Sequence, residues 1–240
     1  MKQGKGHRAE GTVPLNRALS KLGVLSRAQA TEAILAGRVR VDGRVAGTPT
    51  TPVVPEQARI ELDGRPVGRA AWRTILLHKP RGVVTTRSDP EGRRTVYDVL
   101  GAHGRGLIAV GRLDVATSGL LLLTTDTRLA DWLTDPQNEV PRLYVVTVRG
   151  RVTDGDVRDL SGTIAIRKAS ERETHLLVEL REGRNRQVRR MFERIGHEVT
   201  SLRRVRFGGL DLGALQPGEF REILHKEISR AFPRAPLREV

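Results

Sequence analysis

The chain has no cysteine, and this absence removes several kinds of chemistry at once. Disulfide bonds, zinc sites built from thiolates and thiolate nucleophiles are all excluded. No apolar run approaches the roughly 20 residues that a membrane-spanning helix needs. Residues 1–10 are polar and lack the apolar core of a secretory signal. We therefore expect a soluble, cytoplasmic protein with no membrane partner.

Acidic residues are also scarce relative to basic ones. The chain holds 42 Lys and Arg against 28 Asp and Glu, which gives a net charge of +14. Only six of the basic residues are Lys, and the codon bias of a GC-rich genome would explain that preference for Arg. Such a bias does not explain the excess of bases over acids. An excess of this size attracts polyanions, so the charge favours a nucleic-acid partner.

The chain length of 240 residues suits a small domain followed by a medium one. Residues 1–12 are polar and basic, and we expect them to be a disordered tail. Residues 67–74 belong to a stretch rich in Gly and Arg, which predicts a linker between the two domains. The larger domain is then expected over residues 75–240.

The small domain is expected over residues 13–66. Apolar residues at helical spacing predict a helix over residues 15–22. Ser26 and Gln29 form a capping-box pattern that opens a second helix. Two short strands are predicted on either side of an Asp42-Gly43 turn, which is a typical hairpin sequence.

Two short helices followed by a basic hairpin resemble the S4 RNA-binding domain. The resemblance implies that basic residues at the polar positions of this unit bind RNA. These residues are Arg17, Lys21, Arg27, Arg38 and Arg40. The alternative is a small helical domain that carries ordinary solvated charges.

The larger domain is predicted to be rich in strands. Apolar runs predict strands over residues 75–77, 83–86, 107–110, 120–124, 143–148 and 175–180. Helices are predicted near residues 127–133, 153–160 and 185–195. Because strands dominate and the helices are expected outside them, we predict an α+β fold with a mixed, mainly antiparallel sheet flanked by helices.

One loop carries more polar groups than a turn between two strands needs. Residues 111–119 join two apolar strands and contain Arg112, Asp114, Thr117 and Ser118. The two hydroxyls can fix the loop, and Arg112 gives Asp114 a cationic neighbour in the sequence. A nearby cation favours the ionised carboxylate that a nucleophile or base requires. A turn aspartate that caps its own backbone is the alternative, and the spacing alone leaves both open.

Four segments of the larger domain resemble the bacterial ribosomal-RNA pseudouridine synthases typified by RsuA and RluB. They are Lys79-Pro80-Arg81-Gly82, the segment 88–98, Gly111-Arg112-Leu113-Asp114 with the following residues 117–124, and the segment 182–191. They run in the order of the family over about residues 74–225, and an S4 module is the usual partner of this domain. The segment 88–98 favours the RluB-like branch, whose members modify a uridine in a hairpin of large-subunit (23S) ribosomal RNA, and a target in the small subunit is the alternative.

The resemblance implies a role for each matching residue. Asp114 matches the catalytic aspartate of the family, and Tyr144 matches its active-site tyrosine. Arg189 matches the basic residue that pairs with the aspartate. Arg112 matches an arginine that helps to occupy the site of the flipped nucleotide.

The implied reaction breaks the bond between ribose C1′ and uracil N1, rotates the base and rejoins it through C5. A stacked base must first be extruded into a pocket. The carboxylate could act as a nucleophile or as a base on the sugar, and Tyr144 could stack on the detached uracil. Tyr144 also shares a strand face with Val146 and Val148, so a core position is the alternative. The isomerisation involves no redox step or group transfer, so no cofactor or metal is implied.

The segment 181–206 contains nine Arg and three Glu. Its apolar residues form a helical stripe that consists of Val188, Met191, Phe192 and Ile195. The stripe leaves Arg186 and Arg190 facing outward, where they could bind phosphates, although a merely solvated face is the alternative. Family members often have Lys or Glu where Arg142 stands and His where Arg186 stands, so these positions depart from the family pattern.

Two other functions fit parts of the sequence. An S4-containing RNA chaperone or ribosome-assembly factor would need no catalysis, but the Asp114, Tyr144 and Arg189 set is intact. An RNA hydrolase or glycosidase usually needs two carboxylates or a metal cluster. Asp126, the nearest second acid, follows a full apolar strand and is predicted to cap a helix. We expect a monomer that acts on ribosomal RNA, either mature or in an assembly intermediate.

Overall fold

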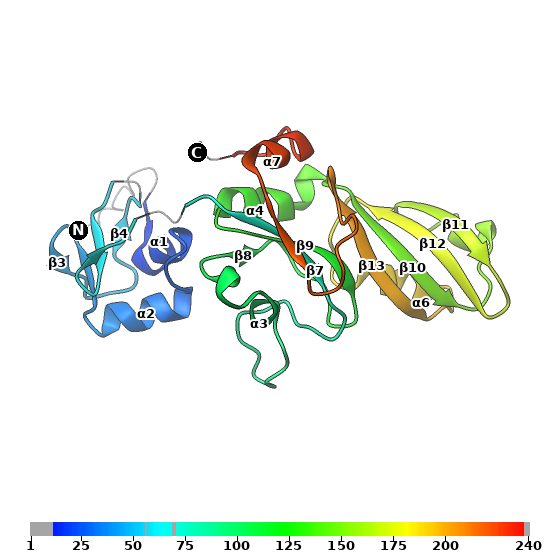
Figure 1. Cartoon of the computed structure of the whole chain (residues 1–240), viewed down its shortest axis with the longest axis horizontal. Helices are drawn as coiled ribbons and strands as arrows, with labels where there is room; N and C mark the ends of the chain where they lie inside the picture. Colours follow the sequence, from blue (N-terminus) through cyan, green and yellow to red (C-terminus); the bar gives the residue numbers. More distant parts are fainter. Residues whose placement is uncertain (1–11, 56, 69–70, 238–240) are drawn as a thin grey trace, which may run out of the picture. The chain divides into compact units, whose positions relative to one another are not determined.

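The computed structural model describes residues 12–55, 57–68 and 71–237. The chain divides into two compact units, with the boundary between Ala71 and Trp72 (Figure 1). Apart from Thr12, the tail expected over residues 1–12 lies outside the described residues. Of the linker expected over residues 67–74, Val67 packs against the core of the first unit and Thr74 lies in a strand of the second.

The described residues of the first unit form two helices and six short strands. They are β1 (Val13–Pro14), α1 (Leu15–Lys21), α2 (Arg27–Leu35), β2 (Val39–Val41), β3 (Arg44–Val45), β4 (Pro52–Val53), β5 (Ile60–Leu62) and β6 (Arg65–Pro66). Strands β3, β2, β5 and β6 form a four-stranded antiparallel sheet in that order, and β1 pairs with β4. Leu15, Leu19 and Ile34 join the two helices in the core, with at most 1% of each side chain exposed.

The predicted helix cap and the predicted hairpin turn of this unit both form. Ser26 is the N-cap of α2: its hydroxyl accepts the Gln29 N–H, and the Gln29 side chain accepts the Ser26 N–H. Asp42 and Gly43 connect β2 to β3 with φ angles of 49° and 80°, which a tight hairpin turn of the I′ type requires. Both predictions are confirmed.

The second unit is built on a nine-stranded sheet. Its strands are β7 (Thr74–Lys79), β8 (Ile108–Ala109), β9 (Ser118–Thr124), β10 (Arg142–Arg149), β11 (Thr163–Ala169), β12 (Glu173–Leu180), β13 (Val199–Phe207), β14 (Leu210–Asp211) and β15 (Phe220–Ile223). The order is β11-β12-β10-β13-β9-β7-β15, with β14 beside β13 and β8 beside β9. Neighbours are antiparallel except β9 and β13, which are parallel. The predicted mixed, mainly antiparallel sheet is confirmed.

Helices flank this sheet, as Figure 1 shows for α4, α6 and α7. The helices are α3 (Val96–Leu100), α4 (Thr127–Thr134), α5 (Asp154–Val157), α6 (Gln187–Arg194) and α7 (His225–Ala231), with the 3-10 turns η1 (Gly101–Gly104) and η2 (Pro136–Asn138). Asp126 caps α4 as predicted, because its carboxylate accepts the N–H groups of Arg128 and Leu129. Within the described ranges no helix combines the length and apolarity needed to cross a membrane.

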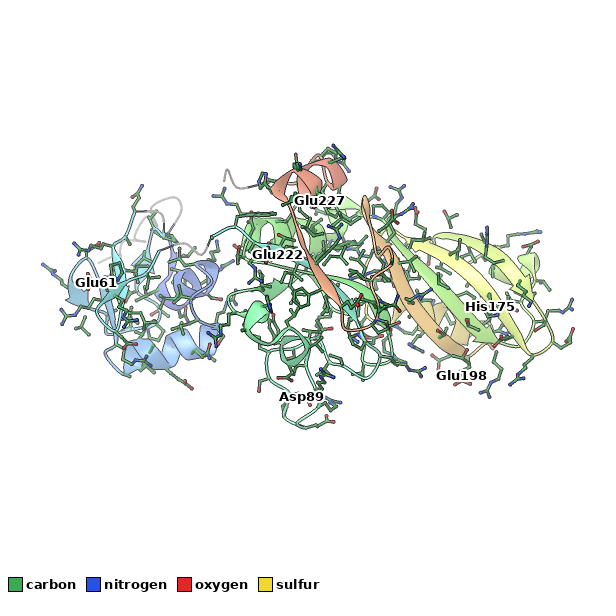
Figure 2. The ribbon with its side chains drawn as sticks, viewed as in Figure 1. Glu61, Asp89, His175, Glu198, Glu222 and Glu227 are labelled. Atoms are coloured by element: carbon green, nitrogen blue, oxygen red, sulfur yellow. The ribbon has the colours of Figure 1, made fainter. Side chains whose placement is uncertain are left out.

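Two further contacts fix the edge of the sheet next to α7 (Figure 2). Arg221 of β15 pairs with Glu227 of α7 at 2.9 Å, and Arg73 pairs with Glu222 at 2.7 Å. Phe232, just after α7, packs edge-on against Phe207 of β13. The C-terminal segment therefore joins the core of the second unit.

Two expectations about this unit are wrong or incomplete, and one edge strand was missed. Residues 83–86 do not form a strand: Val84 makes an isolated bridge to Thr95, and Thr85 turns its hydroxyl to the loop that carries Asp114. The helix predicted over residues 153–160 is only one turn long. The edge strand β11 was not predicted, because it is largely exposed and shows little apolar alternation.

Two halves of the sheet, β11-β12-β10-β13 and β9-β7-β15, meet where β13 pairs with β9. This parallel pairing is very short, and we call it the β9–β13 joint. β9 and β13 pair only through Ser118 with Arg203 and Gly119 with Arg204. Gly119 has a φ of +109°, and a Cβ atom there would lie 2.2 Å from the Arg204 carbonyl oxygen. Only glycine fits this close approach of two backbones. The joint lies directly after the Asp114 loop, so it sets where that loop ends.

A Gly119→Ala substitution is expected to destabilise the second unit by about 3 kcal/mol or more, because it combines a backbone clash with a left-handed φ. Urea unfolding followed by circular dichroism measures the loss. Gly155→Ala is the matched control, since its Cβ would meet only Thr153 at 3.6 Å. Equal unfolding midpoints for the two variants would contradict the close backbone contact between Gly119 and Arg204.

Candidate active site

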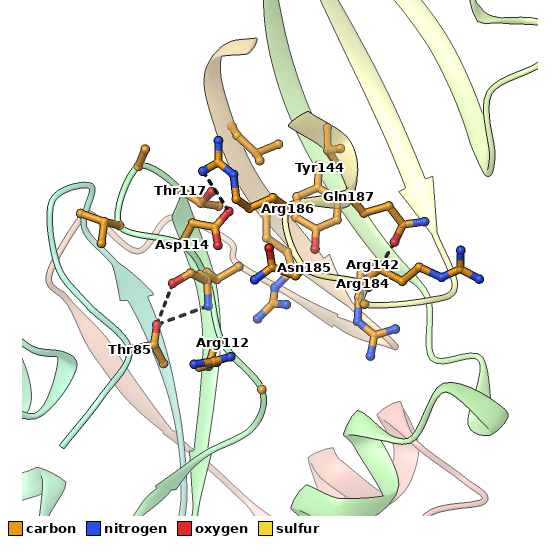
Figure 3. A pocket seen from close by; sticks show the side chains of 18 of the residues that line it. Thr85, Arg112, Asp114, Thr117, Arg142, Tyr144, Arg184, Asn185, Arg186 and Gln187 are labelled. Atoms are coloured by element: carbon orange, nitrogen blue, oxygen red, sulfur yellow. Dashed lines mark hydrogen bonds and ion pairs between the residues drawn. The ribbon is translucent and has the colours of Figure 1, made fainter. Parts of the chain in front are cut away.

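A cavity of about 720 Å³ lies beside the β9–β13 joint (Figure 3). One wall is the loop with Arg112 and Asp114, and another is the segment 182–188 that leads into α6. Tyr144 of β10 and Arg204 of β13 line the same cavity. Its volume lies in the range that small-molecule sites commonly have.

The Asp114 loop is held through its backbone. Residues 113–117 form neither helix nor strand, yet each of their five carbonyl oxygens accepts a hydrogen bond. The donors are Thr85 Oγ1 to Leu113 (2.9 Å), Thr117 N–H to Asp114 (2.9 Å), Gly82 N–H to Val115 (2.7 Å), Arg189 Nη2 to Ala116 (3.1 Å) and Lys79 Nζ to Thr117 (2.8 Å). We call these five bonds the carbonyl clamp. Because all five carbonyls have a donor, the path of the loop is fixed by its backbone.

Lys79 is the least expected member of the clamp. It ends β7, its side chain is fully buried, and its ammonium also donates to the Pro80 carbonyl at 2.9 Å. Burial lowers the pKa of Lys79 to about 8, and the nearby negative charge of Asp114 opposes that shift. The Lys-Pro-x-Gly turn therefore holds the loop from one side, through the Lys79 side chain and the Gly82 N–H.

The carboxylate of Asp114 is about one-third exposed, and positive charges surround it. The Arg186 guanidinium lies 4.0 Å from Asp114 Oδ2 (Figure 3). The charge of Asp114 also acts on Lys79 and on Arg189. Arg186 reaches this place from a left-handed backbone conformation, with a φ of 50°, just before α6 begins.

Arg189, the expected partner of Asp114, is affected by the charge of that carboxylate, while the ion pair within 4.0 Å is made by Arg186. Arg189 donates to the backbone carbonyls of Val199 and Ala116, at 2.8 Å and 3.1 Å, and so holds the loop that carries Asp114. Burial, followed by the charge of Arg186, lowers the pKa of Arg189. Arg112, the cationic neighbour in the sequence, is exposed and lies apart from Asp114 (Figure 3).

Tyr144 lies between a core cluster and the cavity. Its side chain is half-buried against the same core cluster as Val146 and Val148, and it also lines the cavity. It pairs in register with Arg204 of β13, which lines the cavity as well. The ring is thus packed on one side by the core and available to a ligand on the other.

The hydroxyl of Thr117 does not fix the loop as expected. Thr117 Oγ1 is buried and has no hydrogen-bond partner, so the loop is held by the Thr117 carbonyl instead. Thr85 supplies the hydroxyl that does hold the loop, because it donates to Leu113 O and accepts Leu113 N–H.

The predicted RNA-binding residues are all exposed, and their surroundings differ. They are Arg17, Lys21, Arg27, Arg38 and Arg40 of the first unit and Arg186 and Arg190 of the second. Arg38 makes two hydrogen bonds to the Asp63 carboxylate, so much of its charge is already compensated. The predicted stripe of α6 is confirmed, because Val188, Met191 and Phe192 are buried.

Several residues of the site were not expected from the sequence. Lys79 and Thr85 belong to the clamp, and Arg142 and Arg204 are buried beside the cavity. One signal could have indicated Lys79, namely a lysine that ends a strand of otherwise continuous burial. In the described ranges no group of three or more His, Asp or Glu side chains is arranged to hold a metal ion.

Comparison with known families identifies the class of enzyme. The family model described as RNA pseudouridylate synthase matches residues 73–194, and the S4 domain model matches residues 13–58. The chain belongs to the RNA pseudouridylate synthase family. The Asp114 loop and Tyr144 both lie within the matched segment of that family.

Relatives of this pseudouridylate synthase cover most of its length. A protein of Bacillus subtilis (strain 168) named ribosomal large subunit pseudouridine synthase B is 38% identical over 90% of this chain and 94% of its own. The protein of that name from Escherichia coli (strain K12) is 41% identical over 82% of this chain and 74% of its own. A solved structure titled pseudouridylate synthase matches with a TM-score of 0.62 at 26% identity, over 91% of this chain and 99% of that one.

Lys79 gives the stability of the synthase a specific pH dependence. Its pKa is about 8 in the folded state and near 10.5 when it is free, so between these values the folded protein binds fewer protons than the unfolded one. The cost of burying the charge is fully present below pH 8 and is relieved as the pH rises toward 10.5. Wild type should therefore gain stability relative to Lys79→Met by up to about 1.4 kcal/mol per pH unit in this window.

Urea unfolding of both proteins at several values between pH 7 and pH 10 measures this difference. Lys226→Met is the matched control, because Lys226 is an exposed lysine of α7. Its stability difference from wild type should stay flat over the same range. A flat difference for Lys79→Met would contradict the burial of a charged amine at this position.

Proposed function

We propose that this enzyme isomerises uridine to pseudouridine in large-subunit ribosomal RNA, with Asp114 as the essential carboxylate. The observation that carries the proposal is the carbonyl clamp. It fixes the backbone of Asp114 while leaving the carboxylate partly exposed in a cavity. A group that must attack or deprotonate a bound sugar needs this combination of fixed position and access.

Tyr144 supports the same reaction. The uracil leaves its sugar during the isomerisation and must be held while it rotates, and an aromatic face in the cavity can hold it by stacking. The cavity is also large enough for an extruded nucleotide, which the reaction on a stacked base requires. Arg112, exposed at the edge of the cavity, is proposed to help occupy the space that the nucleotide leaves.

A hydrolase is disfavoured because the other carboxylates that line the cavity are already paired with arginines. Besides Asp114, the acids that line the cavity are Asp89 and Glu182. Asp89 accepts two hydrogen bonds from the guanidinium of Arg93, and Glu182 pairs with Arg184 at 2.9 Å. Two carboxylates free to act together, as glycoside hydrolysis requires, are not found among the lining residues.

The proposed substrate rests on the relatives and on charge. The relatives named above carry large-subunit ribosomal RNA in their names. The exposed basic residues of the S4 unit are proposed to bind phosphates of the same RNA as the catalytic domain, either mature or in an assembly intermediate. We propose that the enzyme acts as a monomer in the cytoplasm, where ribosomal RNA is made in a bacterium.

Pseudouridine mapping tests the reaction, the substrate and the role of Asp114 together. Ribosomal RNA from cells that lack the gene is incubated with wild type or with Asp114→Asn, and carbodiimide-dependent primer-extension stops are read. A stop in large-subunit RNA is expected with wild type alone, and Asp114→Asn should reduce its formation at least about a thousandfold, as loss of an essential catalytic group does.

Asp131→Asn is the matched control, because it makes the same change at an exposed aspartate of α4. It should give the wild-type stop at the wild-type rate. A stop formed equally by Asp114→Asn would remove the proposed role of this carboxylate. Loss of mass from the RNA at the modified nucleotide would indicate hydrolysis instead of isomerisation.

A further inference from the structure

Two buried guanidinium groups lie over one aromatic ring at the edge of the cavity. The Cζ atoms of Arg142 (β10) and Arg204 (β13) are 5.1 Å and 4.9 Å from the centroid of Phe207. Only 5% of Arg142 and 4% of Arg204 is exposed. All three residues line the same cavity as Asp114 and Tyr144. We call them the Arg142–Phe207–Arg204 cluster.

The charges of this cluster have no counter-ion among the described residues. Arg142 donates to three backbone carbonyls, those of Leu133, Val140 and Arg181, and Arg204 Nε donates to the Leu120 carbonyl. Arg204 Nη2 is buried without any acceptor. Two buried like charges repel each other and have lost their hydration, which is costly unless an anion compensates them.

The acids around the cavity cannot supply that anion. Asp89 is bonded to Arg93, Glu182 to Arg184, and Asp114 lies next to Arg186. Each lining carboxylate therefore has a cation of its own. Figure 3 shows Arg142 on the Tyr144 side of the cavity, away from the Asp114–Arg186 pair.

A structural role accounts for only part of the cluster. Arg142 donates to Leu133 in the last turn of α4, where a cation is favourable because helix carbonyls point there. This explains why one arginine is tolerated at that position. It does not explain the second, whose buried Nη2 is left without a partner next to an existing positive charge.

We propose that the Arg142–Phe207–Arg204 cluster is an anion subsite for one phosphate of the substrate RNA, next to the uridine that enters the cavity. The proposal rests on the proposed function, since it takes RNA as the ligand. A guanidinium donates hydrogen bonds to a phosphate, which would supply an acceptor for Arg204 Nη2 and a counter-ion for the cluster. Fixing this phosphate sets the position of the adjoining ribose relative to Asp114.

The test uses the full-length enzyme and a synthetic hairpin that contains the uridine found by mapping. Each phosphate near this uridine is replaced in turn by an uncharged methylphosphonate, and kcat/KM for pseudouridine formation is measured. Wild type should lose about tenfold or more at one phosphate and much less at the others. Losses below twofold at every phosphate would overturn the proposal without any variant.

Arg204→Gln then links the sensitive phosphate to the cluster. This variant should lose about tenfold on the unmodified hairpin and should show no further loss when the sensitive phosphate is neutralised. Arg203→Gln, at the exposed neighbouring position of β13, is the matched control and should keep the wild-type sensitivity. Circular dichroism checks that each variant is folded.

The outcomes separate this proposal from the function on which it rests. If wild type forms no pseudouridine in the unmodified hairpin or in ribosomal RNA, the proposed function fails before the subsite is tested. If wild type is active and Arg204→Gln remains as sensitive as wild type to the same methylphosphonate, only the phosphate subsite is overturned.

Discussion

Asp114 depends on hydrogen bonds that its own side chain does not make. The five carbonyls of residues 113–117 are each bonded, and the donors outside the loop come from two places in the chain. The end of β7 and the segment after it supply Lys79, Gly82 and Thr85, and α6 supplies Arg189. Carbonyls without a donor would be costly where they are buried, so these bonds favour the arrangement seen. The position of the Asp114 backbone therefore depends on where β7 and α6 lie relative to the loop.

The sheet joins two halves, and Phe207 of β13 shares an apolar cluster with Leu76 of β7 and Leu120 of β9. One half, with β10, β12, β13 and α6, packs its own apolar cluster, and the strands β7 and β9 contribute to others. The halves meet at a parallel contact two residues long, made possible by Gly119. The cavity lies beside that joint, so residues from both halves face one space. Catalytic and binding groups are thereby brought together from segments that are far apart in the sequence.

The features that could be predicted from the sequence are those formed between residues close together in the chain. The Ser26 cap, the Asp42-Gly43 turn and the Asp126 cap depend on residues within one turn of each other, and each forms as expected. The family motifs correctly indicated the enzyme class. The pairing of Arg186 with Asp114 could not be predicted, because it depends on how α6 meets a loop some 70 residues earlier. The bond from Lys79 to Thr117 likewise requires the neighbouring strands β7 and β9 in register.

Single-turnover kinetics of Thr85→Val tests the central claim that backbone bonds position Asp114. The substitution keeps the shape of the side chain and removes both bonds to Leu113. The account predicts a rate constant for pseudouridine formation lowered about tenfold or more, with the Kd for RNA within twofold of wild type. Thr147→Val, which loses a bond to His175 on β12, should leave both unchanged. An unchanged rate constant for Thr85→Val, or a loss confined to the Kd, would contradict the account.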